Sequence, residues 1–145
     1  MILFSSALET ILEYKIIMNK LIIDVVGEKI FLMIITKDDI YNITKENTKI
    51  NYEKLTLIVK DFLNSNSLKL DNISKIYVNQ GPGSFASIRN SLSLVKALNV
   101  SRRIDYYCYS FNDFKDQKDI KYEDIPNLCD KFKIKKNLIK PIYLS

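Results

Sequence analysis

The 145-residue sequence contains no histidine, only two cysteines and only three glycines. Without histidine, and with Cys108 and Cys129 far apart in the chain, the histidine- and cysteine-rich ligand sets that hold zinc or other transition metals cannot be built. Two cysteines also do not make a disulfide framework, so we expect both to be reduced, unreactive thiols. The sequence therefore predicts no metal site.

A long uninterrupted apolar run is also missing. The apolar segment from Met1 to Ile17 is broken by Glu9, Glu13 and Lys15, and it has neither a basic lead-in nor a small-residue cleavage site. It is thus typical of neither a signal peptide nor a membrane span, and we expect a cytoplasmic protein with no membrane partner. Because Met18 leads directly into the first expected strand, residues 1–17 are predicted to be an N-terminal extension, with Met18 as an alternative start.

The composition is that of one soluble globular domain, with 47% hydrophobic and 27% charged residues. The net charge of +5 is concentrated near the C-terminus, where residues 130–145 contain five lysines and a single aspartate. A lysine run can bind phosphates, but without interleaved arginines and aromatics it more often forms a solvated face. Contact with RNA through this tail therefore stays the less favoured of two interpretations.

Hydrophobic periodicity predicts an α/β domain with three antiparallel strands followed by parallel strands and two main helices. The expected strands are residues 20–26, 29–36, 40–44, 73–79 and 104–109, and the expected helices are residues 52–66 and 85–99. The helix over 52–66 carries an apolar stripe that should pack on the sheet, namely Leu55, Ile58, Val59, Phe62 and Leu63. Alternation of strands with helices implies right-handed crossovers, and the residues after 110 are predicted to be an irregular tail.

The stretch Gln80–Phe85 holds two of the three glycines and lies between an apolar strand and a helix. Ser84 stands at the expected helix N-cap, and the free N–H groups of such a loop can bind an anion, although a purely structural turn is more common. The dinucleotide fingerprint matches weakly, because the acid at the expected distance, Asp105, opens a strand instead of closing one. A Walker loop is excluded because no lysine follows either glycine within the span of that motif.

A longer string gives a more specific signal. Gly81 to Arg89, which reads GPGSFASIR, is followed by Ser91, Lys96, Ala97 and Leu98, and it resembles the GPGSFTGLR-x-G-L-x-x-x-K-G-L signature of the TsaB (YeaZ) family. The resemblance extends from Met18 to about Ser110, and the segment 141–144 is similar to the family's closing P-x-Y-L. It implies a ribonuclease H-like half-domain of the actin-like ATPase superfamily. It also implies a dimerization subunit of the machinery that places threonylcarbamoyl on the adenosine beside the tRNA anticodon.

The chain departs from the family pattern at four points. Asp24, at the end of the first strand, is followed by Val25, Val26 and Gly27 where the family has small hydroxyl residues, and the usual histidine-serine segment is absent. The threonine and glycines of the signature are replaced by Ala86, Ser87, Ser91 and Ala97. The chain is also short, so we expect a lobe over residues 18–110 and only a C-terminal remnant or tail over 111–145.

The second helix carries the functional prediction. Its residues Ile88, Leu92 and Val95 share a face that should pack on the sheet. A second face, which we predict to be the partner interface, combines a row of small side chains with flanking leucines and one residue of the first helix: Leu57, Ala86, Asn90, Ser93, Leu94, Ala97 and Leu98. The alternative is that the C-terminal segment covers this face. The family resemblance implies a four-helix contact with a catalytic paralogue.

The resulting hypothesis is a noncatalytic partner subunit of a TsaD-like threonylcarbamoyltransferase, without catalytic residues or a cofactor of its own. ATP would be bound only when the partner is present. A TsaE-like ATPase, a second copy of the chain and, indirectly, tRNA are further possible partners. The alternative hypothesis is a small nucleotide-binding or ATP-hydrolysing enzyme that uses the Gly81–Gly83 turn and Asp24, which could hold magnesium through water. The signature loop would then contact phosphate instead of the partner, through Gly81, Pro82, Gly83, Ser84, Phe85 and Arg89.

Overall fold

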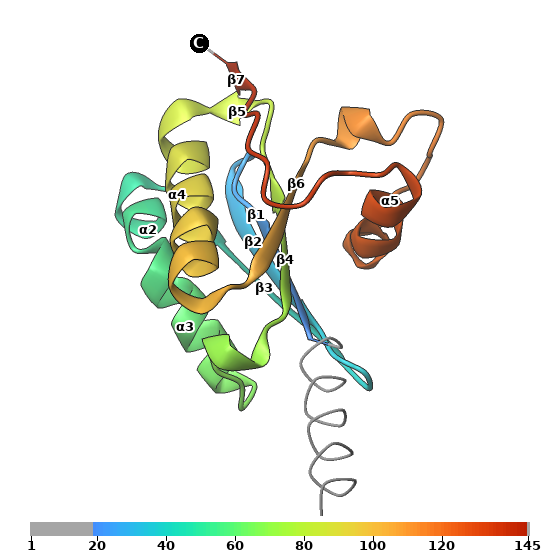
Figure 1. Cartoon of the computed structure of the whole chain (residues 1–145). Helices are drawn as coiled ribbons and strands as arrows, with labels where there is room; N and C mark the ends of the chain where they lie inside the picture. The colour runs from blue at the N-terminus through green and yellow to red at the C-terminus, as the bar shows by residue number, and fades with distance from the viewer. Residues whose placement is uncertain (1–18, 145) are drawn as a thin grey trace, which may run out of the picture.

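The computed structural model describes residues 19–144, and the predicted N-terminal extension over 1–17 and the alternative start at Met18 lie outside the described residues. A five-stranded mixed sheet stands between two layers of helices (Figure 1). Its strands are β1 (Lys20–Asp24), β2 (Lys29–Ile35), β3 (Ile40–Glu46), β4 (Lys75–Asn79) and β6 (Asp105–Tyr109). Their order across the sheet is β3-β2-β1-β4-β6.

The strand directions follow the predicted pattern. β1 pairs antiparallel with β2, and β2 pairs antiparallel with β3, whereas β4 pairs parallel with both β1 and β6. This is the meander followed by two strand-helix crossovers that a ribonuclease H-like half-domain requires, so the predicted fold is confirmed. β1 ends two residues earlier than expected because the Asp24 side chain accepts a hydrogen bond from the N–H of Val26 and turns the chain.

The first predicted helix is divided in two. α2 (Lys49–Glu53) begins after Thr48, whose hydroxyl accepts a hydrogen bond from the N–H of Asn51 at 3.3 Å, and α3 (Leu55–Ser65) follows directly. The predicted stripe of α3 is buried in full. α4 (Phe85–Arg102) extends one turn beyond its predicted end and stops at Arg103, which has the left-handed φ of 57°.

The region after β6 is more ordered than predicted. Instead of an irregular tail, the structure shows α5 (Ile125–Lys131), which packs on the face of the sheet opposite to α3 and α4 (Figure 1). Pro126 occupies the first turn of this helix, where its missing N–H has no intrahelical partner to lose. Helical spacing places Ile125, Leu128 and Cys129 against Ile22 of the sheet, so this region forms a third layer with its own apolar core.

The chain then returns along β6 toward the loop over residues 80–85, which holds Gly81 and Gly83 and is called the glycine loop below. Its last described residues form β7 (Tyr143–Leu144), which pairs in parallel with β5 (Gly83–Ser84) at one end of the molecule (Figure 1). Cys108 and Cys129 were predicted to be reduced thiols; both are free, and the fold buries both. Among residues 19–144, no helix is both long enough and apolar enough to cross a lipid bilayer.

Candidate functional site

The two glycines of the loop allow close approach of other parts of the chain, Ile142 of the C-terminal segment at Gly81 and Val26 after β1 at Gly83. Gly81 has a φ of +120°, and a Cβ atom there would lie 2.1 Å from the carbonyl oxygen of Ile142. At Gly83 a Cβ atom would lie 2.9 Å from the carbonyl oxygen of Val26. The peptide between Gly81 and Pro82 is cis. The need for glycine is therefore explained by backbone packing within the chain.

The hydrogen-bonding groups of the loop are also bonded to other residues of the chain. The N–H of Gly81 donates to Asn79 Oδ1 at 3.0 Å, and the N–H of Gly83 donates to the carbonyl of Ile142 at 3.3 Å. Gln80 accepts twice from the C-terminal segment: its carbonyl from the N–H of Ile142 and its side-chain oxygen from the N–H of Lys140, both at 2.9 Å. A phosphate would have to displace these contacts, so the loop as folded is not an open anion cradle.

α4 begins at Phe85 with Ser84 as its N-cap residue, as predicted, but the expected capping hydrogen bond is not made. Ser84 makes no capping hydrogen bond to a backbone N–H; its hydroxyl lies 2.7 Å from the hydroxyl of Ser87. Phe85 is 53% exposed and meets Tyr143 edge to face, with ring centroids 4.8 Å apart. Arg89 lies 5.8 Å from the Phe85 ring centroid. The exposed residues of the signature therefore face outward beside the C-terminal segment.

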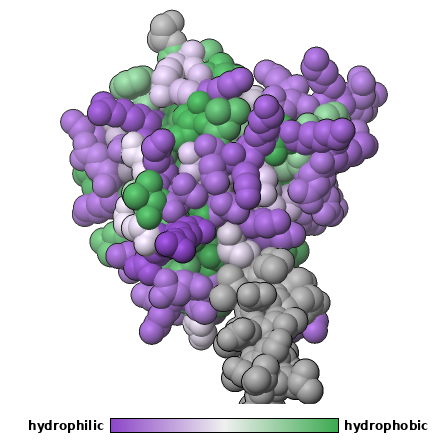
Figure 2. Space-filling model, viewed as in Figure 1, coloured by the Kyte–Doolittle hydropathy of each residue, from purple (hydrophilic) through white to green (hydrophobic). Residues whose placement is uncertain are grey.

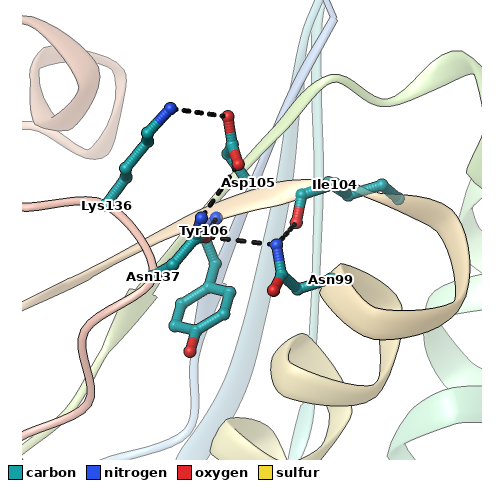
Figure 3. A network of polar contacts seen from close by, with 6 residues as sticks. All are labelled: Asn99, Ile104, Asp105, Tyr106, Lys136 and Asn137. Carbon is teal, nitrogen blue, oxygen red and sulfur yellow. Dashed lines mark hydrogen bonds and ion pairs between the residues drawn. The ribbon is translucent and has the colours of Figure 1, made fainter.

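A polar network anchors that segment to the end of α4 and to β6 (Figure 3). The side-chain oxygen of Asn137 accepts from the N–H of Tyr106 at 3.0 Å and from Asn99 Nδ2 at 3.3 Å. The Asn137 amide nitrogen donates to Asp105 at 3.0 Å, and Lys136 Nζ lies 3.8 Å from the same carboxylate. Because Asn137 satisfies donors and acceptors of the edge strand, the segment is fixed in register with β6.

Asp24 is a buried carboxylate whose oxygens accept hydrogen bonds from the chain itself. It is 4% exposed and accepts hydrogen bonds from the Tyr122 hydroxyl at 2.8 Å, from Asn79 Nδ2 at 3.1 Å and from the N–H of Val26 at 3.1 Å. Tyr122 also stacks on Phe31 at a centroid distance of 4.0 Å. Burial and, next, the Asp24 charge raise the pKa of the Tyr122 hydroxyl, which keeps it protonated and donating.

A water-bound magnesium ion at Asp24 would have to displace hydrogen bonds made by the chain itself. The Asp24 oxygens are held by these donors, and one of them, Tyr122, comes from the layer that covers this end of the sheet. Within residues 19–144, no group of three histidine, cysteine or acidic side chains lies close enough to hold a metal ion. Sequence reasoning did not find Tyr122, since nothing in the pattern around residue 122 marks a contact with residue 24.

The predicted partner interface is divided between surface and core. Leu57 is 55% exposed, and the small residues Ala86, Ser93 and Ala97 are exposed while Asn90 is half-buried. Leu94 and Leu98, however, are not on the surface. They are 8% and 5% exposed because they pack in the core that α3 and α4 share with the sheet, which corrects their predicted role as flanking interface residues.

The C-terminal segment does not cover this face. A groove of about 460 Å³ runs between α3 and α4 and is open along the row that includes Asn90, Ser93 and Ala97. On the other side of α4, Ile139 and Tyr143 border a second groove of about 610 Å³. The remaining lining residues of the first groove are Thr56, Lys60, Leu70, Leu94, Leu98, Ser101 and Arg102, and those of the second are Arg89, Leu92, Ser93, Lys96, Ala97 and Val100.

Val100 is the exposed residue that the prediction missed. It is 75% exposed, more than any other large hydrophobic residue in the described part of the chain. It continues the row of Ser93 and Ala97 by one further helical step, so the same spacing argument applied to residue 100 could have found it. The prediction stopped at residue 99, where the helix was expected to end.

Two comparisons identify relatives of this fold. A family model described as TsaD: tRNA N6-adenosine threonylcarbamoyltransferase matches residues 46–110, a segment that contains α3, β4, the glycine loop, α4 and β6. A search of curated proteins found no match. Among solved structures, YeaZ from Pseudomonas aeruginosa matches with a TM-score of 0.59 and 18% identity. A structure described as an uncharacterized protein with similarity to peptidase YEAZ, also from Pseudomonas aeruginosa, matches with the same values.

The match is partial on both sides. It covers 63% of this chain and 43% of each of the two solved chains, so this chain spans less than half of their length. At 18% identity the structural match establishes the fold. Together with the segment that the family model finds, it confirms the expected resemblance of this chain to the TsaB (YeaZ) family.

Proposed function

We propose that this chain is a noncatalytic partner subunit of a TsaD-like threonylcarbamoyltransferase that modifies the adenosine beside the tRNA anticodon. The observation that carries the proposal is the contrast between two regions. The Asp24 end of the sheet is closed by the chain's own side chains, whereas the outer surface of α3 and α4 exposes Leu57, Val100 and a row of small residues.

The exposed helical surface suits a helix-helix contact. Side chains as small as those of Ala86, Ser93 and Ala97 let a second helix approach closely, and Leu57 and Val100 would add apolar area at the sides. Stable protein interfaces commonly bury roughly 800 Å² on each partner, with a few central residues supplying most of the affinity. Two adjacent helices of 11 and 18 residues are long enough to present such an area.

The catalytic step is assigned to the partner. This chain has no histidine, its buried acid at the end of β1 is fully engaged, and the N–H groups of Gly81 and Gly83 are bonded within the chain. A TsaD-like subunit would supply the ATP-dependent chemistry and the tRNA contact. The match of residues 46–110 to the TsaD family model supports a shared ancestry of the two half-domains, which favours pairing of like surfaces.

Co-purification tests the proposal. Tagged chain would be expressed with the TsaD-like subunit of the same organism, and the amount of co-eluting partner would be measured by mass spectrometry and size-exclusion chromatography. Ser93→Arg places a long cation on the open row and should abolish co-elution. Asn127→Arg is the matched control, since Asn127 is an exposed helical residue on α5 at the opposite face of the sheet. Equal co-elution of both variants would contradict the proposed face.

Calorimetry with ATP separates this proposal from the enzyme hypothesis. We expect no measurable ATP binding by the isolated chain and a clear signal only when the TsaD-like subunit is present. Tight binding by the isolated chain that is lost in Asp24→Asn would instead favour a small nucleotide-binding or ATP-hydrolysing enzyme. Asp24→Asn keeps the size of the side chain, so a loss of binding would report on charge more than on shape.

A further inference from the structure

We propose that β3 is a docking edge for an extended segment of a partner protein, which would add to the sheet as a further strand and carry an acidic residue two positions from an apolar one. The inference goes beyond the proposed function and does not depend on it, because β3 lies at the sheet edge and apart from α4. Strand addition needs unpaired backbone groups at a sheet edge and a place for alternate side chains beside them. Both are present along β3.

The two edges of the sheet differ in what covers them. At the β6 edge, the returning C-terminal segment forms a bridge between Lys136 and Tyr107, and the N–H of Asn137 donates to the carbonyl of Tyr106. Figure 2, which has the same view as Figure 1, shows mainly hydrophilic side chains over α5 and the segment that returns from it. At the other edge, β3 pairs with β2 alone among the described strands. The chain itself therefore covers part of one edge and leaves the other open within residues 19–144.

The hydrogen-bond register shows which backbone groups of β3 face outward. In an antiparallel pair, every second residue bonds to the neighbouring strand, and the residues between them direct their N–H and C=O groups away from it. Asn47, directly after β3, donates to the carbonyl of Glu28 at 2.9 Å and so fixes which residues bond to β2. The outward groups consequently belong to Ile40, Asn42 and Thr44. In the part of the chain that the structure describes, no loop or helix bonds to these backbone groups.

This edge lacks the features that commonly protect such strands. Proteins blunt an exposed edge with charges, prolines or bulges. Residues 40–44 read IYNIT, which contains neither a charge nor a proline, and the register with β2 runs without interruption. Ile40 and Tyr41 are 47% and 39% exposed. A regular, uncharged edge rich in β-branched and aromatic residues is suited to pairing with another strand.

A groove of about 650 Å³ lies between β3 and the helices α2 and α3. Tyr41, Ile43 and Lys45 share the face of β3 that borders it, because alternate residues of a strand point to the same side. From α3, Ile58 and Phe62 line the groove as well. A residue of an added strand that stands opposite Ile43 would enter this apolar part, and its neighbour two positions away would stand opposite Lys45.

The charge at one end of the groove favours an acidic residue there. Asn51 of α2 donates to the Glu46 carbonyl at 2.8 Å, which holds α2 beside the end of β3 where Lys45 stands. Lys54 follows α2 directly and lines the same groove as Lys45, and Asp61 lines it about two helical turns further along. No ion pair engages either lysine among the described residues. A carboxylate opposite Lys45 would therefore meet two cations that no described acid neutralises.

A second copy of β3 fits this groove less well. In an antiparallel pair of identical edges, the residues on the groove face would again be Tyr41, Ile43 and Lys45, which include no acid. A segment of a different protein supplies the carboxylate that the two lysines lack.

Amide hydrogen exchange of the free full-length chain, followed by nuclear magnetic resonance, is the first test. Exchange should be fast at Ile40, Asn42 and Thr44, whose N–H groups face outward, and slow at Tyr41 and Ile43, which bond to β2. Slow exchange at the three outward positions would mean that the edge is already covered in the free chain, and it would overturn the proposal.

A synthetic peptide of seven residues, in which one glutamate and two valines alternate with threonines, is the second test. Its binding should shift the amide signals of β3, and replacement of the glutamate by lysine should weaken binding by about fivefold or more. A peptide of the same composition in scrambled order is the control and should bind more weakly. Absence of any shift at millimolar peptide overturns the proposal, as does equal binding of the scrambled peptide.

Matched variants test the contacts. Asn42→Pro removes an outward N–H that makes no bond to β2, so the fold should persist while the peptide affinity falls by about tenfold or more. Asn42→Ala keeps the N–H and should bind like the wild type. Lys45→Glu should also weaken binding, whereas Lys37→Glu, at an exposed lysine before β3 that does not line the groove, should not. If Asn42→Pro lowers the thermal unfolding midpoint, the two lysine variants decide the question.

The outcomes separate this inference from the proposed function. Ser93→Arg should bind the peptide like the wild type, because no residue of α4 lines this groove. Peptide binding that is lost in Ser93→Arg, or that is kept in both Asn42→Pro and Lys45→Glu, overturns the inference. Failure to co-elute with the TsaD-like subunit contradicts the proposed function alone. A dimer of the free chain that is lost in Asn42→Pro would assign the edge to a second copy and overturn the assignment to a different protein.

Discussion

The carboxyl end of β1 and the outer surface of α4 differ in whether other residues of the chain cover their polar and apolar groups. At the first, Asp24 and the glycine loop have their hydrogen-bonding groups matched by Tyr122, Asn79 and Ile142. At the second, apolar side chains such as Val100 remain exposed beside cations that have no acidic neighbour in the grooves. The isolated chain satisfies the hydrogen-bonding groups of the first region, but it leaves apolar side chains of the second region exposed to water.

This difference shows where the chain can interact. A satisfied buried group gains nothing from a new ligand unless the existing contacts are broken, and breaking them costs about 1–3 kcal/mol per unsatisfied group. Exposed apolar area, in contrast, gains free energy whenever a partner removes it from water. The capacity for association therefore lies on the helices, while the glycine loop and Asp24 maintain the fold that positions them.

The largest expected effect comes from the glycine loop. Gly81→Ala should lower the free energy of unfolding by about 3 kcal/mol, because a Cβ atom would collide with the carbonyl oxygen of Ile142 and because a φ of +120° is strained for alanine. Urea denaturation measures the change. Gly27→Ala is the control, since a Cβ atom at Gly27 meets nothing within 4 Å. Equal stability of the two variants would mean that the C-terminal segment does not press on the loop.

The next effect concerns the closed end of β1. Asp24→Ala should destabilise the chain by about 2–3 kcal/mol, since it leaves the Tyr122 hydroxyl and the Asn79 amide without their buried acceptor. Tyr122→Phe removes a single donor and should cost about 1 kcal/mol. Chemical denaturation gives both values, and the affinity for the TsaD-like subunit should stay unchanged. A stabilised Asp24→Ala variant would contradict the account of Asp24 as a satisfied structural group.

The two buried thiols contribute to the loss of stability at alkaline pH, together with the buried tyrosines Tyr77, Tyr109 and Tyr122, whose pKa burial also raises. Burial raises the pKa of Cys108 and of Cys129 from 9.0 to about 12, so each thiol keeps its proton in the native state after it has ionised in the unfolded chain. The native state then binds more protons, and stability falls as pH rises between 9 and about 12, by about 1.4 kcal/mol per pH unit for each thiol.

Denaturation at several pH values measures this slope. Cys108→Ala removes one of the two thiols and should flatten the decline over the same pH window, even though the smaller side chain lowers the stability at neutral pH. An unchanged slope in this variant would show that Cys108 does not contribute to the alkaline loss.

The smallest expected change in stability is at the open surface. Leu57→Gln and Val100→Gln replace exposed apolar side chains with a good helix former, and each should alter the free energy of unfolding by no more than about 0.5 kcal/mol. The affinity for the TsaD-like subunit should nevertheless fall measurably by calorimetry. Loss of stability without loss of affinity would place these residues in the fold of the chain and outside its interface.

Local patterns were enough for most of the secondary structure. The stripe from Leu55 to Leu63 and the face of Ile88, Leu92 and Val95 each carry a period that only a helix packed on one side satisfies, and both are buried as predicted. Leu94 and Leu98 were misplaced because periodicity gives the angle of a residue on its helix, and it does not say which neighbour stands at that angle. Here the neighbour is α3.

The layer formed by α5 could not be predicted for a similar reason. Ile125, Leu128 and Cys129 are few and are surrounded by polar residues, so the stretch has too little periodicity to indicate a helix by itself. Its helical structure depends on packing against the apolar face of the sheet, to which Ile22 and Tyr77 belong. That face exists only after the strands have paired.

The sequence by itself determined the order of the main strands and helices along the chain and the position of the glycine loop. These depend on residue spacing and on backbone freedom within a few neighbouring residues. Only the tertiary structure decided which residues the glycine loop and Asp24 contact. Ile142 and Tyr122, which engage them, stand about 60 and 98 positions along the chain from their partners. Contacts across such separations are made by packing of complete layers, and no local pattern specifies them.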